Sequence, residues 1–333
     1  MTIQINPSSP QFPTKMPTAI FLDSGGVIND NRRRAPQWLH HLGEFFPTTH
    51  LGGTAVAWSN ANRQVVKTFF NRWHEYMQQA TDEASSNSEN DGEGPNVAVI
   101  FERIHLTEWM KQMCNCVAES LPELKEHLPG LSDQNLFVLA KQAYQYTLQR
   151  VQADFPGAVD TIRKLSEETV GTSDGEMRKR YRLFTSSGDS SDDLEVILKG
   201  IGAFEYFKRI YGSDRVNYLK VSPVFYERIF AREGICVVSR DASTVGEAGA
   251  DQRVLEQEES INEVIVIDDS EKALKWARSL GARTVIIDDE DRVDLSLPHL
   301  AHIDYRLSSL SDLPALLESW KDHFERKKVE SQQ

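Results

Sequence analysis

Polar residues suited to metal or phosphoryl chemistry stand directly after three short apolar runs. In chain order they are Asp23 after residues 18–22, Thr185, Ser186 and Ser187 after 181–184, and Asp268 and Asp269 after 264–267. Ligands of parallel α/β sheets bind at the carboxyl ends of the strands, so we expect these side chains to meet in one crevice. Three carboxylates in close contact repel one another unless a cation neutralises them, and hard oxygen ligands suit Mg²⁺. The spacing therefore predicts a magnesium site.

A lysine and two glycines support this interpretation. Lys220 lies between the second and the last apolar run and supplies a balancing positive charge. Gly25 and Gly26 allow the chain to turn tightly after Asp23, which lets a main-chain carbonyl such as that of Gly25 face a metal. A single Asp at a strand end is usually a cap or a turn residue, so the hypothesis depends on the joint arrangement.

The elements that must position these residues form a βαβ pattern. Short apolar runs separated by helical periodicity predict buried parallel strands, and they occupy residues 18–22, 181–184, 209–211, 264–267 and 284–287. About 160 residues separate the first two runs, and apolar residues recur there at helical spacing. We therefore expect a helical module inserted after the first strand.

The expected organisation is a flexible leader at 1–17, an α/β core made of 18–30 and 155–320, a helical cap at 31–154 and a charged tail at 321–333. Polar or glycine-rich stretches at 85–96, 171–180 and 240–259 predict weakly ordered insertions.

Composition narrows the function classes. The net charge of −13 argues against a non-specific nucleic-acid binder and against a protein of anionic membrane surfaces. There is no apolar run of the length of a membrane span, and the first residues lack the charge and the apolar segment of a secretory signal. Three cysteines are too few for a disulfide scaffold. We expect a cytoplasmic protein, with the nucleus left open.

Four segments in order resemble the haloacid dehalogenase-like (HAD) hydrolases. They are AIFLDSGGVIND, YRLFTSSGD, YLKVSPVFYERIF and VIVIDDSEKAL. The resemblance covers roughly residues 18–320. It implies a Rossmann-like parallel sheet with an α-helical cap inserted after the first core strand.

The resemblance also implies roles for individual residues. Asp23 would be the nucleophile that forms an aspartyl-phosphate, Thr185 would hydrogen-bond the phosphoryl group, and Lys220 would hold both in place. Ser186 and Gly26 would contact the substrate. The Mg²⁺ ligands would be Asp23, the carbonyl of Gly25, Asp268 and Asp269. The cap would close over the site and select the substrate.

One position departs from the family. Gly25 stands where the phosphatases of the family carry a second Asp, the general acid–base. Without this acid, the rate of hydrolysis should fall least for substrates whose leaving group needs no protonation, such as acyl or aryl phosphates. The favoured function is a Mg²⁺-dependent phosphatase of a small intracellular phosphate ester or anhydride. Two alternatives stay open: metal-free carbon–halogen hydrolysis through Asp23, and a non-catalytic binding protein on a degenerate HAD core.

Overall fold

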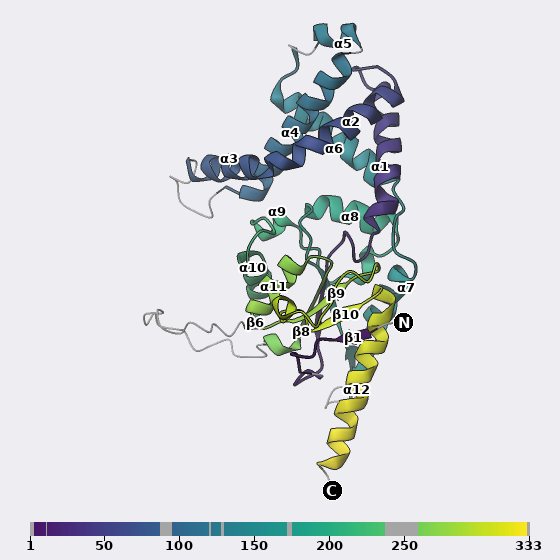
Figure 1. Ribbon diagram of the computed structural model, residues 1–333, viewed down its shortest axis with the longest axis vertical. Helices are drawn as coiled ribbons and strands as arrows, with labels where there is room; N and C mark the ends of the chain where they lie inside the picture. Colours follow the sequence, from purple (N-terminus) through teal and green to yellow (C-terminus); the bar gives the residue numbers. More distant parts are fainter. Residues whose placement is uncertain are drawn as a thin grey trace.

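The computed structural model describes residues 3–10, 12–86, 95–119, 121–127, 130–171, 175–236 and 259–331. Its main sheet has six strands in the order β1-β10-β9-β8-β2-β5, and the helices α1 to α6 stand above it (Figure 1). The strands of this sheet are β1 (Ile3–Ile5), β2 (Ala19–Leu22), β5 (Arg182–Thr185), β8 (Val264–Asp268), β9 (Arg283–Ile287) and β10 (Tyr305–Leu307). Two smaller pairs are β3 (Thr169–Gly171) with β4 (Met177–Lys179), and β6 (Ile235–Cys236) with β7 (Glu259–Ser260).

The α-helices fall into two groups along the chain. Those of the insertion are α1 (Asn31–Phe45), α2 (Ala55–Phe69), α3 (Trp73–Ser86), α4 (Val97–Ala118), α5 (Pro122–His127) and α6 (Asp133–Leu148). Those that follow are α7 (Ala158–Glu167), α8 (Ser191–Gly200), α9 (Ser213–Val216), α10 (Val224–Arg232), α11 (Glu271–Ser279) and α12 (Leu313–Glu330).

Strand β2 is an inner strand next to the edge strand β5, and it pairs in parallel with β5 and β8. Its four residues are fully buried, and they alternate between two hydrophobic clusters because successive side chains of a strand face opposite sides. Ile20 and Leu22 pack with residues of α7 and α12, whereas Ala19 and Phe21 pack with residues of α10 and α11. The predicted α/β fold with a parallel sheet is therefore confirmed.

The helices α1 to α6 have a hydrophobic cluster of their own, around residues such as Trp58, Trp109 and Met110. The chain enters and leaves this helical insertion through two segments that pair with each other. Asn29 forms a β-bridge with Asp154, and the main-chain N–H of Asp30 donates to the carbonyl of Ala153 at 2.7 Å. The two connections thus form one narrow junction between the insertion and the sheet.

The predicted flexible leader differs from the structure. Residues 3–5 form β1, which extends the sheet as an antiparallel edge strand beside β10. The buried Asn6 side chain donates to the carbonyls of Leu300 and Ile303 at 3.0 and 2.8 Å. Main-chain pairing with a distant strand holds this segment, and local composition carries no signal of such pairing.

Three other expectations are also adjusted. The run at 209–211 lies beside β5 through a single bridge between Arg209 and Phe184 and is not a full strand. Part of 171–180 belongs to the antiparallel strands β3 and β4, and the tail expected at 321–333 begins inside α12. Most of the insertion predicted at 240–259 lies outside the described residues. No helix within the described ranges has both the length and the apolar character needed to cross a membrane.

Candidate functional site

Three carboxylates meet at the carboxyl ends of β2 and β8. Leu22 lies opposite Ile267 in the parallel ladder, and the N–H of Asp23 donates to the carbonyl of Ile267 at 3.0 Å. Ligand oxygens of Asp23, Asp268 and Asp269 all lie within 4.8 Å of one another. The convergence expected from the strand ends is thus present in the structure, and we call these three residues the carboxylate cluster.

Lys220 contributes the positive charge nearest to this cluster. Its Nζ lies 2.7 Å from Asp268 Oδ2 and 3.2 Å from Asp23 Oδ1, and the side chain is only 10% exposed. Burial by itself lowers the pKa of Lys220, but Asp23 and Asp268 raise it well above its usual value. The lysine is therefore charged and bridges the two carboxylates.

One lysine does not neutralise three acids. Burial raises the pKa of Asp268 to about 7, although Lys220 opposes this shift. Burial and the charge of Asp23 also raise the pKa of Asp269 to about 6. The Asp268 carboxylate receives further hydrogen bonds from Tyr226 Oη at 3.2 Å and the N–H of Ser270 at 3.0 Å. The excess negative charge that remains is what a bound cation would relieve.

The glycine turn after Asp23 is packed against the cluster. Gly26 has a φ of 75°, and a Cβ at this position would collide with the Asp269 carboxylate. Its N–H donates to the carbonyl of Asn29 at 2.8 Å. Gly26 is therefore required by backbone conformation and by the close approach of Asp269, and its predicted contact with substrate stays a prediction.

The structure separates the roles of Thr185 and Ser186. The buried Thr185 hydroxyl donates to the carbonyl of Tyr211 at 3.0 Å and accepts from the Tyr211 N–H at 2.7 Å. It therefore holds the segment beside β5, and the expectation that it faces a phosphoryl group is corrected. Ser186 donates its N–H to the carbonyl of Leu22 at 2.9 Å, which places it beside Asp23. Its buried hydroxyl has no hydrogen-bond partner within the described part of the chain.

Asn31 is a site residue that sequence reasoning missed. A Cβ on Gly25 would lie 3.2 Å from the Asn31 amide, so this side chain adjoins the position where the family's second acid stands. Asp30, the neighbouring acid, caps α1 by accepting a hydrogen bond from the Arg32 N–H at 2.9 Å. The only sequence signal at Asn31 is a polar residue at a helix start, which is too common to be informative.

A cavity of about 790 Å³ lies between the helical insertion and the sheet domain. From the sheet side its lining includes Gly188, Asp189 and Ser190, which follow Ser186 closely. From the insertion it is lined by Asn31 and other residues of α1, α2, α3, α4 and α6. The carboxylate cluster itself does not line it. The cavity is therefore adjacent to the cluster on the side of the insertion.

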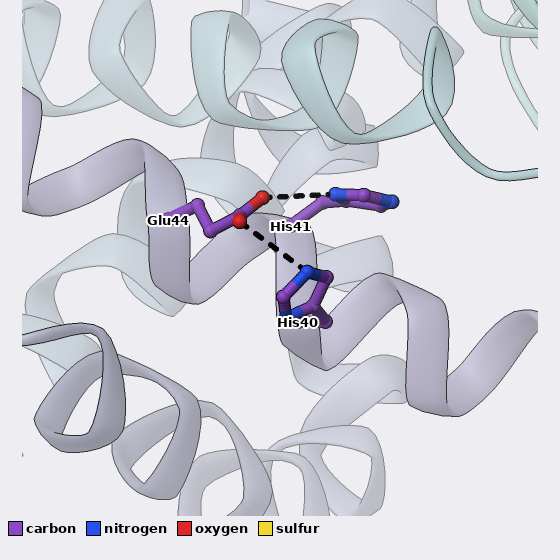
Figure 2. Close-up of side chains that lie close together, drawn as sticks. All are labelled: His40, His41 and Glu44. Carbon is purple, nitrogen blue, oxygen red and sulfur yellow. Dashed lines mark hydrogen bonds and ion pairs between the residues drawn. The ribbon is translucent and has the colours of Figure 1, made fainter.

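A second cluster lies on the outer part of α1. Figure 2 shows His40 and His41 each directed at one carboxylate oxygen of Glu44, with Nε2–Oε1 and Nδ1–Oε2 distances of 3.3 and 3.1 Å. Sequence spacing alone had not identified this group. The side chains of His40 and Glu44 are 65% and 43% exposed, so these are surface contacts of modest energy.

The residues present fit Mg²⁺ at the carboxylate cluster. The donors are carboxylate oxygens, which Mg²⁺ prefers, and their like charges need a counter-ion in addition to Lys220. Asp23, Asp268 and Asp269 would hold the ion, and the Gly25 carbonyl stays a predicted fourth ligand.

Comparison with known proteins supports the fold. No family profile and no curated protein matches the chain. Among solved structures, a 2-haloacid dehalogenase from Pseudomonas syringae aligns with a TM-score of 0.52 and 15% identity, over 92% of this chain and 100% of that one.

Two other structures align with lower scores. The HAD-hydrolase YfnB from Bacillus subtilis, bound to magnesium, has a TM-score of 0.47 and 14% identity over 91% of this chain and 99% of its own. An L-2-haloacid dehalogenase from Xanthobacter autotrophicus has a TM-score of 0.45 and 14% identity over the same shares. The sheet order, the inserted helices and the alignment with the Pseudomonas enzyme together show that this chain has the haloacid dehalogenase-like fold.

Proposed function

We propose that this protein is a Mg²⁺-dependent hydrolase of phosphate esters or anhydrides that works through an aspartyl-phosphate on Asp23. The observation that carries the proposal is the carboxylate cluster with Lys220 bridging Asp23 and Asp268. Metal-free chemistry gives no reason to gather three acids, two of which have a pKa that burial and the charge of Asp23 raise. The proposed substrate is a small phosphorylated molecule of the cell interior.

In the first step, a carboxylate oxygen of Asp23 attacks phosphorus, and the bond between phosphorus and the leaving oxygen breaks. Lys220 orients Asp23 and balances charge on the phosphoryl oxygens. The free hydroxyl of Ser186, next to Asp23, donates a hydrogen bond to one of those oxygens. Bound Mg²⁺ would supply further charge neutralisation. Water then hydrolyses the aspartyl-phosphate, which releases phosphate and restores Asp23.

The test is hydrolysis of an aryl phosphate with and without Mg²⁺, by wild type and by Asp23→Asn. We expect activity that requires Mg²⁺ and disappears in the variant. Asp30→Asn is the matched control, because Asn also caps helices and this residue lies outside the carboxylate cluster. If folded wild type is no faster than Asp23→Asn, the phosphatase proposal is wrong, and carbon–halogen hydrolysis or a non-catalytic binding role takes its place.

Carbon–halogen hydrolysis is the second candidate. Halide departs without a proton, so the glycine at position 25 costs this reaction nothing. Asp23 would displace halide from carbon, and water would hydrolyse the resulting ester. Release of chloride from a 2-chloro acid without added Mg²⁺, lost in Asp23→Asn, is the outcome that favours this reaction over phosphate hydrolysis.

A further inference from the structure

The cavity beside the carboxylate cluster has walls of an unusual chemistry. Its volume of about 790 Å³ suits a small organic ligand. The side chains that face it from the insertion include a large aromatic group: Trp38, Phe69, Trp73, Phe101, Trp109 and Tyr144. Apolar and aromatic walls of this kind bind flat apolar groups by area burial and ring contacts.

The cavity adjoins the reactive end of the site through two of its lining residues. A Cβ on Gly188, which lines the cavity, would lie 3.9 Å from the Cβ of Lys220. Asn31 lines the cavity and adjoins Gly25. The leaving group of a phosphoryl group at Asp23 can therefore extend toward this space.

The absence of an acid at position 25 also restricts which leaving groups can depart. Gly25 and its neighbour Asn31 carry no carboxyl that could protonate a departing oxygen. A phenol has a pKa of about 10, so a phenolate departs far more easily than the much more basic alkoxide. The absence of an acid at Gly25 favours a leaving group that departs as a stable anion. The aromatic walls of the cavity favour a leaving group with an aromatic ring, and a phenolate meets both requirements.

We propose that the cavity binds the aromatic ring system of an aryl phosphate, which makes aryl phosphate monoesters the preferred substrate class. Arg34, Arg63 and Lys67 line the cavity together with Glu102, Asp189, Asp193 and Asp214, so charges of both signs surround the apolar wall. The inference that aryl phosphates are hydrolysed rests on the proposed phosphatase function. The inference that the cavity binds their aromatic ring does not.

Two variants of α2 provide a matched pair. Val66 lines the cavity and is 37% exposed, whereas Val56 is 69% exposed and does not line it. Val66→Glu places a charge in the apolar wall, and Val56→Glu places the same charge elsewhere on the same helix. We expect Val66→Glu to raise the KM for 2-naphthyl phosphate about tenfold, the equivalent of about 1.4 kcal/mol. The KM for acetyl phosphate should rise less, and Val56→Glu should change neither.

A substrate series tests the preference itself. In wild type, kcat/KM should fall from 2-naphthyl to phenyl to propyl phosphate. Replacing naphthyl by phenyl should mainly raise KM, and replacing phenyl by propyl should mainly lower kcat. Equal values for naphthyl and propyl phosphate, or equal effects of the two variants, would overturn the inference while the phosphatase function stands.

A binding measurement separates the two hypotheses. Titration of wild type with 2-naphthylmethylphosphonate, which cannot be hydrolysed at phosphorus, should change the fluorescence of the cavity tryptophans and give a Kd by calorimetry. If binding weakens in Val66→Glu but no phosphate ester is hydrolysed, the aromatic site is supported and the proposed function is wrong. If the phosphonate does not bind to an active phosphatase, the aromatic site is wrong.

Discussion

The fully buried carboxylate of Asp268 depends on a small set of partners. Lys220 and Tyr226 contact one oxygen, and the N–H of Ser270 contacts the other. Removing one member of a buried ion pair usually costs about 3–5 kcal/mol, because the remaining charge stays buried without compensation. Residues of this site therefore have structural roles alongside chemical ones, and single variants must be compared with matched controls.

Thr185 and Ser186 form such a matched pair. Thr185→Val leaves two main-chain groups of Tyr211 without their side-chain partner, so we expect a loss of about 1–3 kcal/mol in the free energy of unfolding. The folded variant should keep its activity. Ser186→Ala should fold normally and lose about 10²-fold in kcat, because it removes a hydrogen-bond donor beside Asp23. Urea unfolding and steady-state kinetics on both variants check this, and the reverse pattern would restore Thr185 as the phosphoryl contact.

Gly26 and Gly202 allow a similar comparison. Both have a positive φ, 75° and 72°, so an alanine at either position costs about 1–2 kcal/mol of backbone strain. A Cβ at Gly26 also collides with Asp269, whereas nothing lies within 4 Å of one at Gly202. We therefore expect Gly26→Ala alone to lose Mg²⁺-dependent activity. Similar activity in the two variants, at similar thermal stability, would show that Asp269 is free to move.

At the scale of elements, the carboxylate cluster depends on the pairing of strands, and the cavity depends on the two connections to the helical insertion. Strands β2, β5 and β8 place Asp23, Ser186 and Asp268 side by side, because the parallel pairing continues for one residue beyond β2 and β5 while Asp268 ends β8. The helical insertion is connected through the paired segments at Asn29 and Asp154. If the junction bends, the cavity between the helical insertion and the sheet domain therefore changes shape, while the carboxylate cluster stays the same.

The helical insertion should respond to acid through His105 of α4. This imidazole packs against the rings of Phe69 and Phe101, and burial lowers its pKa to about 4. The unfolded chain binds a proton near pH 6.5, so stability falls as the pH drops below 6.5 and stops falling near pH 4. At pH 5.5 the expected loss relative to neutral pH is about 1.4 kcal/mol.

The measurement is urea unfolding at pH 7.5 and 5.5 for wild type and His105→Phe. We expect the difference between the two pH values to be about 1.4 kcal/mol smaller in the variant. The exposed His74→Phe serves as the control, and it should behave as wild type. An unchanged difference in His105→Phe would mean that the ring titrates normally in the folded protein.

At the scale of the whole molecule, metal binding and folding are linked. A ligand that binds only the folded state stabilises it by about 2.7 kcal/mol at a concentration of 100 times its Kd. In a chain of this size, we expect Mg²⁺ to raise the Tm by a few degrees. Asp269→Asn should weaken this response, since it removes one charged ligand of the cluster.

Asp289→Asn is the control for this experiment, because Asp289 pairs with Arg32 away from the cluster. Thermal scans with Mg²⁺ and with a chelator check the prediction. The same Mg²⁺-induced shift in wild type and Asp269→Asn would exclude Asp269 as a ligand.

The sequence by itself determined the parallel strands and the acids that follow them. Asp23, Asp268 and Asp269 were predictable because buried parallel strands are continuous apolar runs, and polar residues after such runs stand at one edge of the sheet. The long helical insertion was predictable from its 3.6-residue periodicity. These are local patterns, and each depends on residues near one another in the chain.

Only the tertiary structure decided which hydroxyl faces the site and what lines the cavity. Thr185 and Ser186 are adjacent, so their roles depend on the register of β5 against β2 and on the segment at Tyr211. Strand β1 forms because residues 3–5 pair with the edge of β10, a strand far away in the sequence. The cavity gathers side chains from helices far apart in the sequence, and packing between them has no local signature. For that physical reason, the carboxylate cluster was predictable from sequence and the lining of the cavity was not.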